Sequence, residues 1–184
     1  MALKGITFAY QVPTAKAFRS FFAGTLTDGF IDTTTINISR SAPEVEFSEN
    51  NYVMADGGIV ELNDVSKFTF TPNNKAYGRL KLVIDTTKAS TKTQFKQASL
   101  VADYSNTLAG FSELRQDDIN SPGATGTYEA ELLLVQFNYM PVPDSDPMVF
   151  PTLIRVAKVA PKLLYGDTLP GDAVDGTIFL VKST

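Results

Sequence analysis

The side chains that could do chemistry together in this chain are carboxylates. Asp117 and Asp118 are adjacent, and Glu129 and Glu131 stand two positions apart, on one side of any strand that holds them. Two carboxylates that flank a bond are the machinery of glycoside hydrolysis. However, Asp118 is followed by Ile-Asn-Ser-Pro-Gly, a turn sequence in which Asp and Asn side chains bond to nearby backbone amides. We therefore interpret the aspartates as turn residues and the glutamates as part of a solvated strand face.

The composition removes most other catalytic chemistry. The 184 residues contain no cysteine and no histidine, which excludes thiol nucleophiles, Ser-His-Asp catalysis and imidazole or thiolate metal sites. Calcium is conceivable at Asp144 with Asp146 or at Asp172 with Asp175, although neither loop has the spacing of an EF-hand. The glycines are turn residues and predict no phosphate site. We expect a chain that is not an enzyme, with no catalytic residue, cofactor or metal.

Charge and hydropathy restrict the partners. The formal net charge is −4 and the basic residues are scattered, so no basic block predicts nucleic-acid binding. No apolar run approaches the ~20 residues of a membrane helix, and residues 1–24 lack the continuous apolar stretch of a signal peptide. We expect a protein that is made in a cytoplasm and has neither nucleic acid nor membrane as a partner.

Short alternating apolar runs predict an all-β chain. The clearest local signal is a hairpin, in which residues 52–55 and 59–62 flank Asp56-Gly57-Gly58. Residues 77–85 alternate apolar and charged side chains, which predicts one buried face and one wet face. Further strands are expected at residues 29–40, 68–71, 94–102, 126–137, 148–159 and 176–182. The turn spacing predicts an antiparallel, jelly-roll-like β-sandwich with extended N- and C-terminal arms.

We predict one sandwich domain with peripheral arms. Residues 1–28 form either an N-terminal arm or a short helix over residues 14–23, and both alternatives stay open. A turn at residues 112–116 is a second place for a helix. Residues 29–184 form the sandwich, whose proline-rich part from Pro141 onward suits edge strands and extended crossings. Residues 178–180 are expected to close the sandwich.

Aromatic residues crowd the first 30 positions and need burial, either in the core or in a subunit interface. The interface interpretation assigns the contact with a neighbouring subunit to Phe18, Phe21 and Phe22. A carbohydrate-binding module is a competing interpretation, because tyrosine rings beside carboxylates can hold sugars. Its candidate glycan contacts are Tyr104, Tyr139 and Tyr165.

Three segments together carry a resemblance to a family. They are GRLKLVID at residues 78–85, LRQDDIN at 114–120 and GTYEAEL at 126–132, and they follow the strand-glycine-strand hairpin at residues 55–60. The segment YGDTLPGDAVDGTIFL at 165–180 is similar to the C-terminal pieces of the same proteins. The chain resembles virion structural proteins of tailed bacteriophages, in particular small baseplate, tail-appendage and receptor-binding-associated subunits.

The resemblance implies a non-enzymatic structural protein that is made in the host cytoplasm and resides in the virion. It implies a homo-oligomer around a symmetry axis, with other virion proteins as partners and arms that reach neighbouring subunits. Tail tip, baseplate or appendage anchor is the expected position, and head decoration, neck or major tail component are alternatives. A carbohydrate-binding adhesin that contacts a polysaccharide of the host surface is the alternative function.

Overall fold

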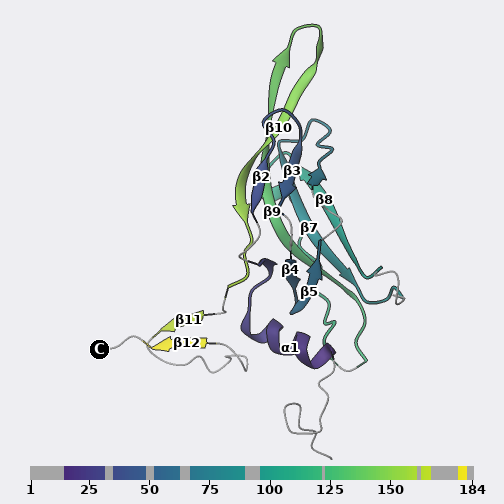
Figure 1. Ribbon diagram of the computed structural model, residues 1–184, viewed down its shortest axis with the longest axis vertical. Helices are drawn as coiled ribbons and strands as arrows, with labels where there is room; N and C mark the ends of the chain where they lie inside the picture. The colour runs from purple at the N-terminus through teal and green to yellow at the C-terminus, as the bar shows by residue number, and fades with distance from the viewer. Residues whose placement is uncertain are drawn as a thin grey trace, which may run out of the picture.

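The computed structural model describes residues 15–31, 35–48, 52–62, 67–89, 96–121, 123–160, 163–166 and 178–181, with the backbone alone for 15–18, 163–166 and 178–181. The described part contains one α-helix, α1 (Ala15–Thr25), and a 3-10 turn, η1 (Leu108–Gly110) (Figure 1). Its strands are β1 (Gly29–Phe30), β2 (Ile36–Ile38), β3 (Glu44–Phe47), β4 (Tyr52–Ala55), β5 (Gly58–Glu61), β6 (Lys67–Thr69), β7 (Tyr77–Asp85), β8 (Ala98–Ser105), β9 (Thr127–Val142), β10 (Ser145–Val156), β11 (Leu163–Gly166) and β12 (Ile178–Val181).

A four-stranded antiparallel sheet in the order β10-β9-β7-β8 forms the centre of the fold. Strand β7 alternates as its sequence predicts, so that Leu80, Leu82 and Ile84 are buried in the hydrophobic core. Arg79 and Lys81, which flank Leu80 in the alternation, therefore lie on the opposite face, which we call the outer face. The pairing of β7 with β9 shifts register between Leu80 and Lys81, which places a bulge beside these two charges.

Two three-stranded sheets, β2-β3-β6 and β1-β4-β5, form the second layer on the core side. Phe70, which follows β6, packs edge-on against Phe137 of β9 with ring centroids 5.5 Å apart. Phe30 of β1 lies 5.6 Å from Phe47 of β3 between ring centroids. One hydrophobic cluster thus joins the three sheets. The all-β, sandwich-like prediction is confirmed, whereas the jelly-roll arrangement stays a prediction.

The predicted hairpin at residues 52–62 is confirmed. Strands β4 and β5 pair antiparallel, and Ala55 opposite Gly58 leaves Asp56-Gly57 as a two-residue turn. Both turn residues have positive φ, 45° and 71°, as a type I′ turn requires. The amide of Asp56 donates a hydrogen bond to Oδ1 of Asp28 at 2.8 Å, which ties the turn to the chain just before β1.

Residues 15–25 form a helix, which decides the open choice between helix and arm for this segment. Helix α1 packs closely on the β4–β5 turn, because a Cβ atom on Gly57 would lie 1.9 Å from the carbonyl oxygen of Arg19. Gly57 is therefore required both by its positive φ and by the approach of the helix backbone. The hydroxyl of Thr25 donates to the carbonyl of Phe21 at 2.9 Å near the end of the helix. Residues 1–14 of the predicted arm lie outside the described residues.

Strands β9 and β10 form a long hairpin that projects beyond both layers of the sandwich (Figure 1). Val142 pairs with Ser145, so Pro143-Asp144 is the turn, and φ of Asp144 is 55°. Proline followed by a residue of positive φ is the pattern of a type II turn. Pro151 lies in β10, an edge strand, where the missing amide does not interrupt a ladder. The expected edge-strand role of the proline-rich segment is confirmed here.

Several predicted boundaries are wrong. Residues 29–40 form two strands, β1 and β2, and residues 32–34 between them lie outside the described residues. Residues 112–116 are not helical. The 3-10 turn of this region, η1, lies before them at residues 108–110. Strand β9 continues beyond residue 137, because β10 pairs with it as far as the turn. Residues 178–180 pair in parallel with β11, whereas we expected them to close the sandwich.

Candidate functional site

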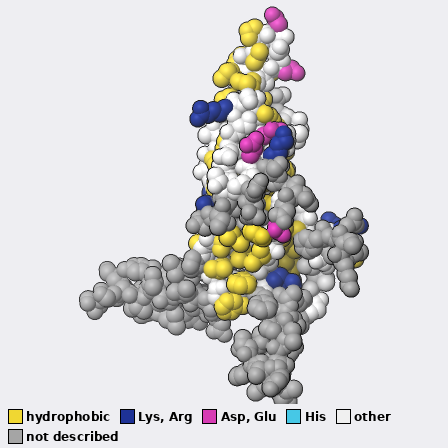
Figure 2. Space-filling view, in the orientation of Figure 1, with side chains coloured by type: hydrophobic (Ala, Val, Ile, Leu, Met, Phe, Trp, Pro, Cys, Tyr) yellow, Lys and Arg dark blue, Asp and Glu magenta, His cyan; other side chains and the backbone are white. Residues whose placement is uncertain are grey.

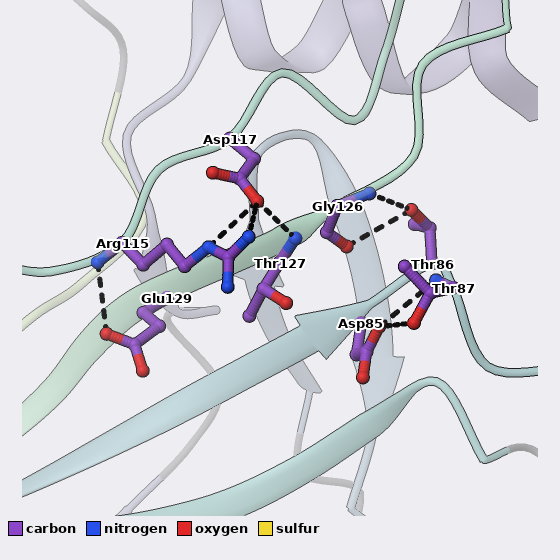
Figure 3. A network of polar contacts seen from close by, with 8 residues as sticks. All are labelled: Asp85, Thr86, Thr87, Arg115, Asp117, Gly126, Thr127 and Glu129. Carbon is purple, nitrogen blue, oxygen red and sulfur yellow. Dashed lines mark hydrogen bonds and ion pairs between the residues drawn. The ribbon is translucent and has the colours of Figure 1, made fainter.

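The turn role predicted for the adjacent aspartates is confirmed. Oδ2 of Asp117 accepts hydrogen bonds from Nε of Arg115 at 2.9 Å and from the amide of Thr127 at 2.8 Å (Figure 3). The bonds from Arg115 and from the Thr127 amide hold the pKa of Asp117 below its usual value. Oδ1 of Asp118 accepts from the amides of Asn120 and Ser121, both at 2.9 Å. Both carboxylates are thus engaged in shaping the loop before β9.

The same loop is fastened to the end of β7, as Figure 3 shows. Oγ1 of Thr86 accepts a hydrogen bond from the amide of Gly126 at 2.9 Å and donates to the Gly126 carbonyl at 3.2 Å. A Cβ atom on Gly126 would lie 2.6 Å from Oδ2 of Asp117, so this close approach needs glycine. The amide of Arg115 donates to Oε2 of Glu129 at 3.0 Å. These bonds fix the loop against the central sheet.

The outer face of the central sheet holds a cluster of four charged side chains, Arg79, Lys81, Asp103 and Glu129, which we call the charge cluster. Nζ of Lys81 lies 2.9 Å from Oδ2 of Asp103 on β8 and 2.9 Å from Oε1 of Glu129 on β9. Nη2 of Arg79 lies 2.8 Å from the same Asp103 oxygen. Arg79 and Lys81 are each only 6% exposed, so the wet face predicted for residues 77–85 is wrong at both positions.

The charges of the cluster shift one another's pKa values. Burial alone lowers the pKa of Lys81, but its bonds to Asp103 and Glu129 outweigh burial, so the pKa is raised. Burial raises the pKa of Asp103, and the bonds from Arg79 and Lys81 outweigh it, so that pKa is lowered. The pKa of Glu129 is lowered in the same way by Lys81 and by the Arg115 amide. Lys81, Asp103 and Glu129 are therefore ionised at neutral pH.

Residues 106–117 cover the charge cluster from the solvent side. The ring of Phe111 lies over the guanidinium of Arg79, with its centroid 4.9 Å from Cζ. The carbonyl of Ser112 accepts a hydrogen bond from Nη2 of Arg79 at 2.9 Å. Nε of Arg79 is buried and has no hydrogen-bond partner in the part of the chain that the structure describes. A polar pocket of about 500 Å³ lies beside Lys81 and this cover.

The charge cluster has the geometry of a cross-link between β8, β7 and β9. Every described carboxyl group with a resolved shift has a lowered pKa, whereas the general acid of glycoside hydrolysis needs a raised one. Glu131, the second glutamate of the predicted pair, lies 2.6 Å from Nη2 of Arg155 on β10. The two glutamates thus bind different cations and do not form a pair with each other.

A second pocket, which we call the α1-side pocket, opens between α1, β5 and the described residues 119–121 and 123–125. Its volume is about 550 Å³. Nε of Arg19, which lines it, donates to Oδ1 of Asn120 at 3.1 Å, and Nδ2 of Asn120 donates to Oδ2 of Asp56 at 2.6 Å. Helix, turn and loop are thereby joined around the pocket. The large apolar side chains that line it are Ile59, Val60, Ile84 and Ile119.

The phenylalanines predicted for a subunit interface lie on α1. Phe21 is 62% exposed and Phe22 is half-buried, and their rings meet edge-to-face with centroids 5.6 Å apart. The side chain of Phe18 lies outside the described part of the structure. The helix therefore presents at least one large aromatic ring to solvent, and the interface role of the three residues stays a prediction.

A second group of exposed apolar residues escaped the sequence reasoning. It occupies the end of the β9–β10 hairpin, residues 140–147, which we call the hairpin tip. All eight residues are exposed, and Met140 and Val142 are 48% and 38% exposed. Figure 2 shows hydrophobic side chains along the projection and acidic side chains at its end. Prolines 141, 143 and 147 mark the segment in the sequence, but they do not reveal that two paired strands continue through it.

The three candidate glycan contacts lie on three different strands. The hydroxyl of Tyr104 accepts a hydrogen bond from the amide of Thr71 at 2.7 Å, and its ring lies 6.2 Å from that of Phe137. The hydroxyl of Tyr139 donates to the carbonyl of Lys75 at 2.7 Å, and burial raises its pKa. Tyr165 is in β11, where the structure describes the backbone alone. A glycan role for these residues stays a prediction.

The calcium alternatives receive no new support. Asp144 and Asp146 are both exposed at the hairpin tip. Asp172 and Asp175 lie outside the described residues. Among the residues that are described, no group of three or more Asp or Glu side chains is arranged to hold a metal ion.

No protein-family model, curated protein or solved structure shows a significant match to the chain. In the described ranges, no helix is long and apolar enough to cross a bilayer. The physical features of the surface are therefore the basis for assigning a function.

Proposed function

We propose that this chain is a non-enzymatic structural protein that self-assembles into a symmetric part of a tailed-bacteriophage virion, at the tail tip, the baseplate or an appendage anchor. The observation that carries the assembly role is the hairpin tip, in which eight consecutive residues are exposed beyond the sandwich. The phage assignment rests on the resemblance of residues 78–85, 114–120 and 126–132. Other virion proteins and copies of the same chain are the proposed partners.

The hairpin tip is poorly supported by its own chain. A two-stranded ribbon without a packed face is at best marginally stable in water. Met140 and Val142 expose apolar surface there, while other residues of β9 such as Leu133 and Val135 are completely buried. Contiguous exposed apolar surface of this kind marks protein-binding sites. Burial of the tip against a neighbour removes this surface from water and gives the ribbon the packed face that it lacks in the single copy.

Helix α1 supplies a second apolar surface. The exposed ring of Phe21 stands on a helix that is fixed to the β4–β5 turn, so an interface that uses it needs little ordering of the backbone. Two separate apolar surfaces let each copy contact more than one neighbour. Repetition of moderate contacts in a symmetric particle gives firm assembly without any single strong site.

The alternative functions have less support. A glycosidase needs a carboxyl group of raised pKa. In the charge cluster, the pKa values of Asp103 and Glu129 are lowered by their cationic neighbours. A carbohydrate-binding adhesin is less favoured because the hydroxyls of Tyr104 and Tyr139 are bonded to backbone groups.

A shortened hairpin tests the assembly role. Met140 pairs with Met148, so residues 141–147 can be replaced by Asn-Gly, which favours a tight hairpin turn. We expect the unmodified chain to form an oligomer. The oligomer of the shortened chain should dissociate at a much higher protein concentration, as measured by light scattering. The matched control is Leu108→Ser, which removes an exposed apolar side chain elsewhere and should leave the oligomer unchanged. Equal masses for the shortened and unmodified chains would contradict the proposal.

A further inference from the structure

We propose that the hairpin tip of one copy binds in the α1-side pocket of the next copy, so that the chain assembles head to tail. This inference rests on the proposed assembly function and names the two surfaces that meet. The partner is therefore a second copy of this chain.

The positions of the two surfaces exclude a contact within one chain. The hairpin tip lies at one end of the longest axis of the molecule, and α1 with β5 lies in the opposite half (Figure 1). A projection at one end and a pocket toward the other give a heterologous interface, in which each copy inserts its tip into one neighbour and receives the tip of another in its pocket. Repeated contacts of this type build a ring when the rotation closes and an open filament when it does not.

The two surfaces match in polarity. Met140 and Val142 bring exposed apolar side chains to the tip, and the Pro143-Asp144 turn makes its end only two residues wide. The pocket offers about 550 Å³ above the buried side chains of Ile84 and Ile119. Ile59 of β5, which also lines the pocket, is itself exposed in the single copy. Docking would remove apolar surface from water on both sides.

The two surfaces also match in charge. Asp144 and Asp146 are exposed at the tip, and neither forms an ion pair with another described residue. Arg19 lines the pocket and likewise forms no ion pair within the described ranges, its Nε being bonded to the neutral Asn120. Opposite charges that are unpaired in the single copy favour this pairing and set its register.

Both surfaces have features that limit the conformational entropy lost on docking. Prolines 141, 143 and 147 restrict the backbone of the tip, so little conformational entropy is lost when it docks. On the pocket side, Asn120 links Arg19 to Asp56, and Gly57 lets α1 lie directly on the turn. The prolines of the tip and the hydrogen bonds around the pocket thus lower the ordering cost of a contact that also supports the marginally stable ribbon.

Charge reversal on each side provides the test. We expect Asp144→Lys with Asp146→Lys, and separately Arg19→Glu, to raise the concentration needed for assembly about tenfold or more, because like charges then face each other. A chain that carries all three substitutions should recover most of the loss. The matched controls are Glu46→Lys and Lys67→Glu, at exposed positions of β3 and β6 that neither belong to the tip nor line the pocket; both variants should assemble like the unmodified chain.

A mixing experiment tests the head-to-tail arrangement itself. The chain shortened at residues 141–147 keeps a pocket but has no tip, and Arg19→Glu keeps a tip but has an impaired pocket. An equal mixture of the two should stop at a dimer, with a mass slightly below twice the 20.0 kDa of the unmodified chain, as measured by light scattering. Circular dichroism and thermal unfolding of each variant alone verify that the sandwich is intact.

The outcomes separate this inference from the proposed function. An unmodified chain that stays monomeric contradicts both. An oligomer that is insensitive to Arg19→Glu, or a loss that the three combined substitutions do not reverse, contradicts the tip-to-pocket contact and leaves the assembly function standing. In that case the tip would bind elsewhere, either in the groove of about 620 Å³ beside β2 and β10 of another copy or on another virion protein.

Discussion

The Nζ atom of Lys81 lies 2.9 Å from Oε1 of Glu129 on the face of the central sheet that points away from the hydrophobic core. The two residues are 48 positions apart in the sequence and belong to neighbouring strands, β7 and β9. Asp103 of β8 binds the same lysine from the other side at 2.9 Å. Three of the four strands of the central sheet are thus cross-linked by charges at one level, beneath the cover of residues 106–117.

Removal of the central cation should destabilise the fold. Lys81→Met leaves the carboxylates of Asp103 and Glu129 close together without their shared partner. Loss of one partner of a fully buried pair costs 3–5 kcal/mol, and because both carboxylates retain some exposure we expect about 2 kcal/mol. The measurement is urea unfolding. Lys67→Met, which breaks an exposed pair with Glu44, is the control and should change stability far less; equal effects would contradict a structural role for the cluster.

Stability should fall in acid partly because of the same cluster. The folded-state pKa values of Asp103 and Glu129 are lowered, so the unfolded chain binds more protons as the pH falls. Their contribution is complete above the usual carboxyl pKa values of about 4 and is lost as the pH falls through the lower folded values. We expect the unfolding free energy of Asp103→Asn to depend less steeply on pH between about 5 and 2 than that of the unmodified chain. Parallel curves would refute this contribution.

The ring of Phe111 should contribute through its contact with Arg79. Phe111→Ala removes the aromatic face that lies 4.9 Å from the guanidinium and exposes the charge cluster to water. We expect a loss of about 1 kcal/mol in urea unfolding. Leu108→Ala, at an exposed position of the same covering segment, is the matched control. If both variants lose the same amount, the ring has no specific effect on the cluster.

The close contact between α1 and the β4–β5 turn can be tested with two glycines of similar backbone. Gly57 and Gly123 have φ of 71° and 79°, so alanine meets similar backbone strain at both positions. A Cβ atom would collide with Arg19 at Gly57 and would meet nothing within 4 Å at Gly123. We expect Gly57→Ala to cost about 1–3 kcal/mol more than Gly123→Ala in thermal unfolding. Equal costs would show that the helix is not held at the turn.

The sequence predicts the core side of this fold well and its outer side poorly. Leu80 and Leu82 follow a local alternation, and their burial needs only that one face of β7 meets the second layer. The burial of Lys81 depends on a cover that comes from residues 106–117, and no local pattern specifies it. The same holds for Arg79, because its contact with Phe111 joins residues 32 positions apart.

Of the surfaces proposed for assembly, the sequence predicts the one on α1 and misses the hairpin tip and the α1-side pocket. Periodic aromatic residues predict the helix at α1, and the structure places Phe21 on its exposed side, whereas its interface role stays a prediction. The hairpin tip was missed because Pro141 and Pro143 are typical of loops, and a strand that projects into solvent has no buried face to produce an apolar alternation. The α1-side pocket is built from α1, β5 and a loop that includes Ile119, so only the tertiary fold brings Arg19 and Ile119 together.

The mass of the unmodified chain in solution tests the central claim most directly. Light scattering over a wide range of concentration distinguishes a 20.0 kDa monomer from any oligomer. Assembly through the hairpin tip predicts a mass that is a multiple of 20.0 kDa and that decreases on dilution. A constant mass of 20.0 kDa at every concentration would contradict the proposal that this chain builds its particle from copies of itself.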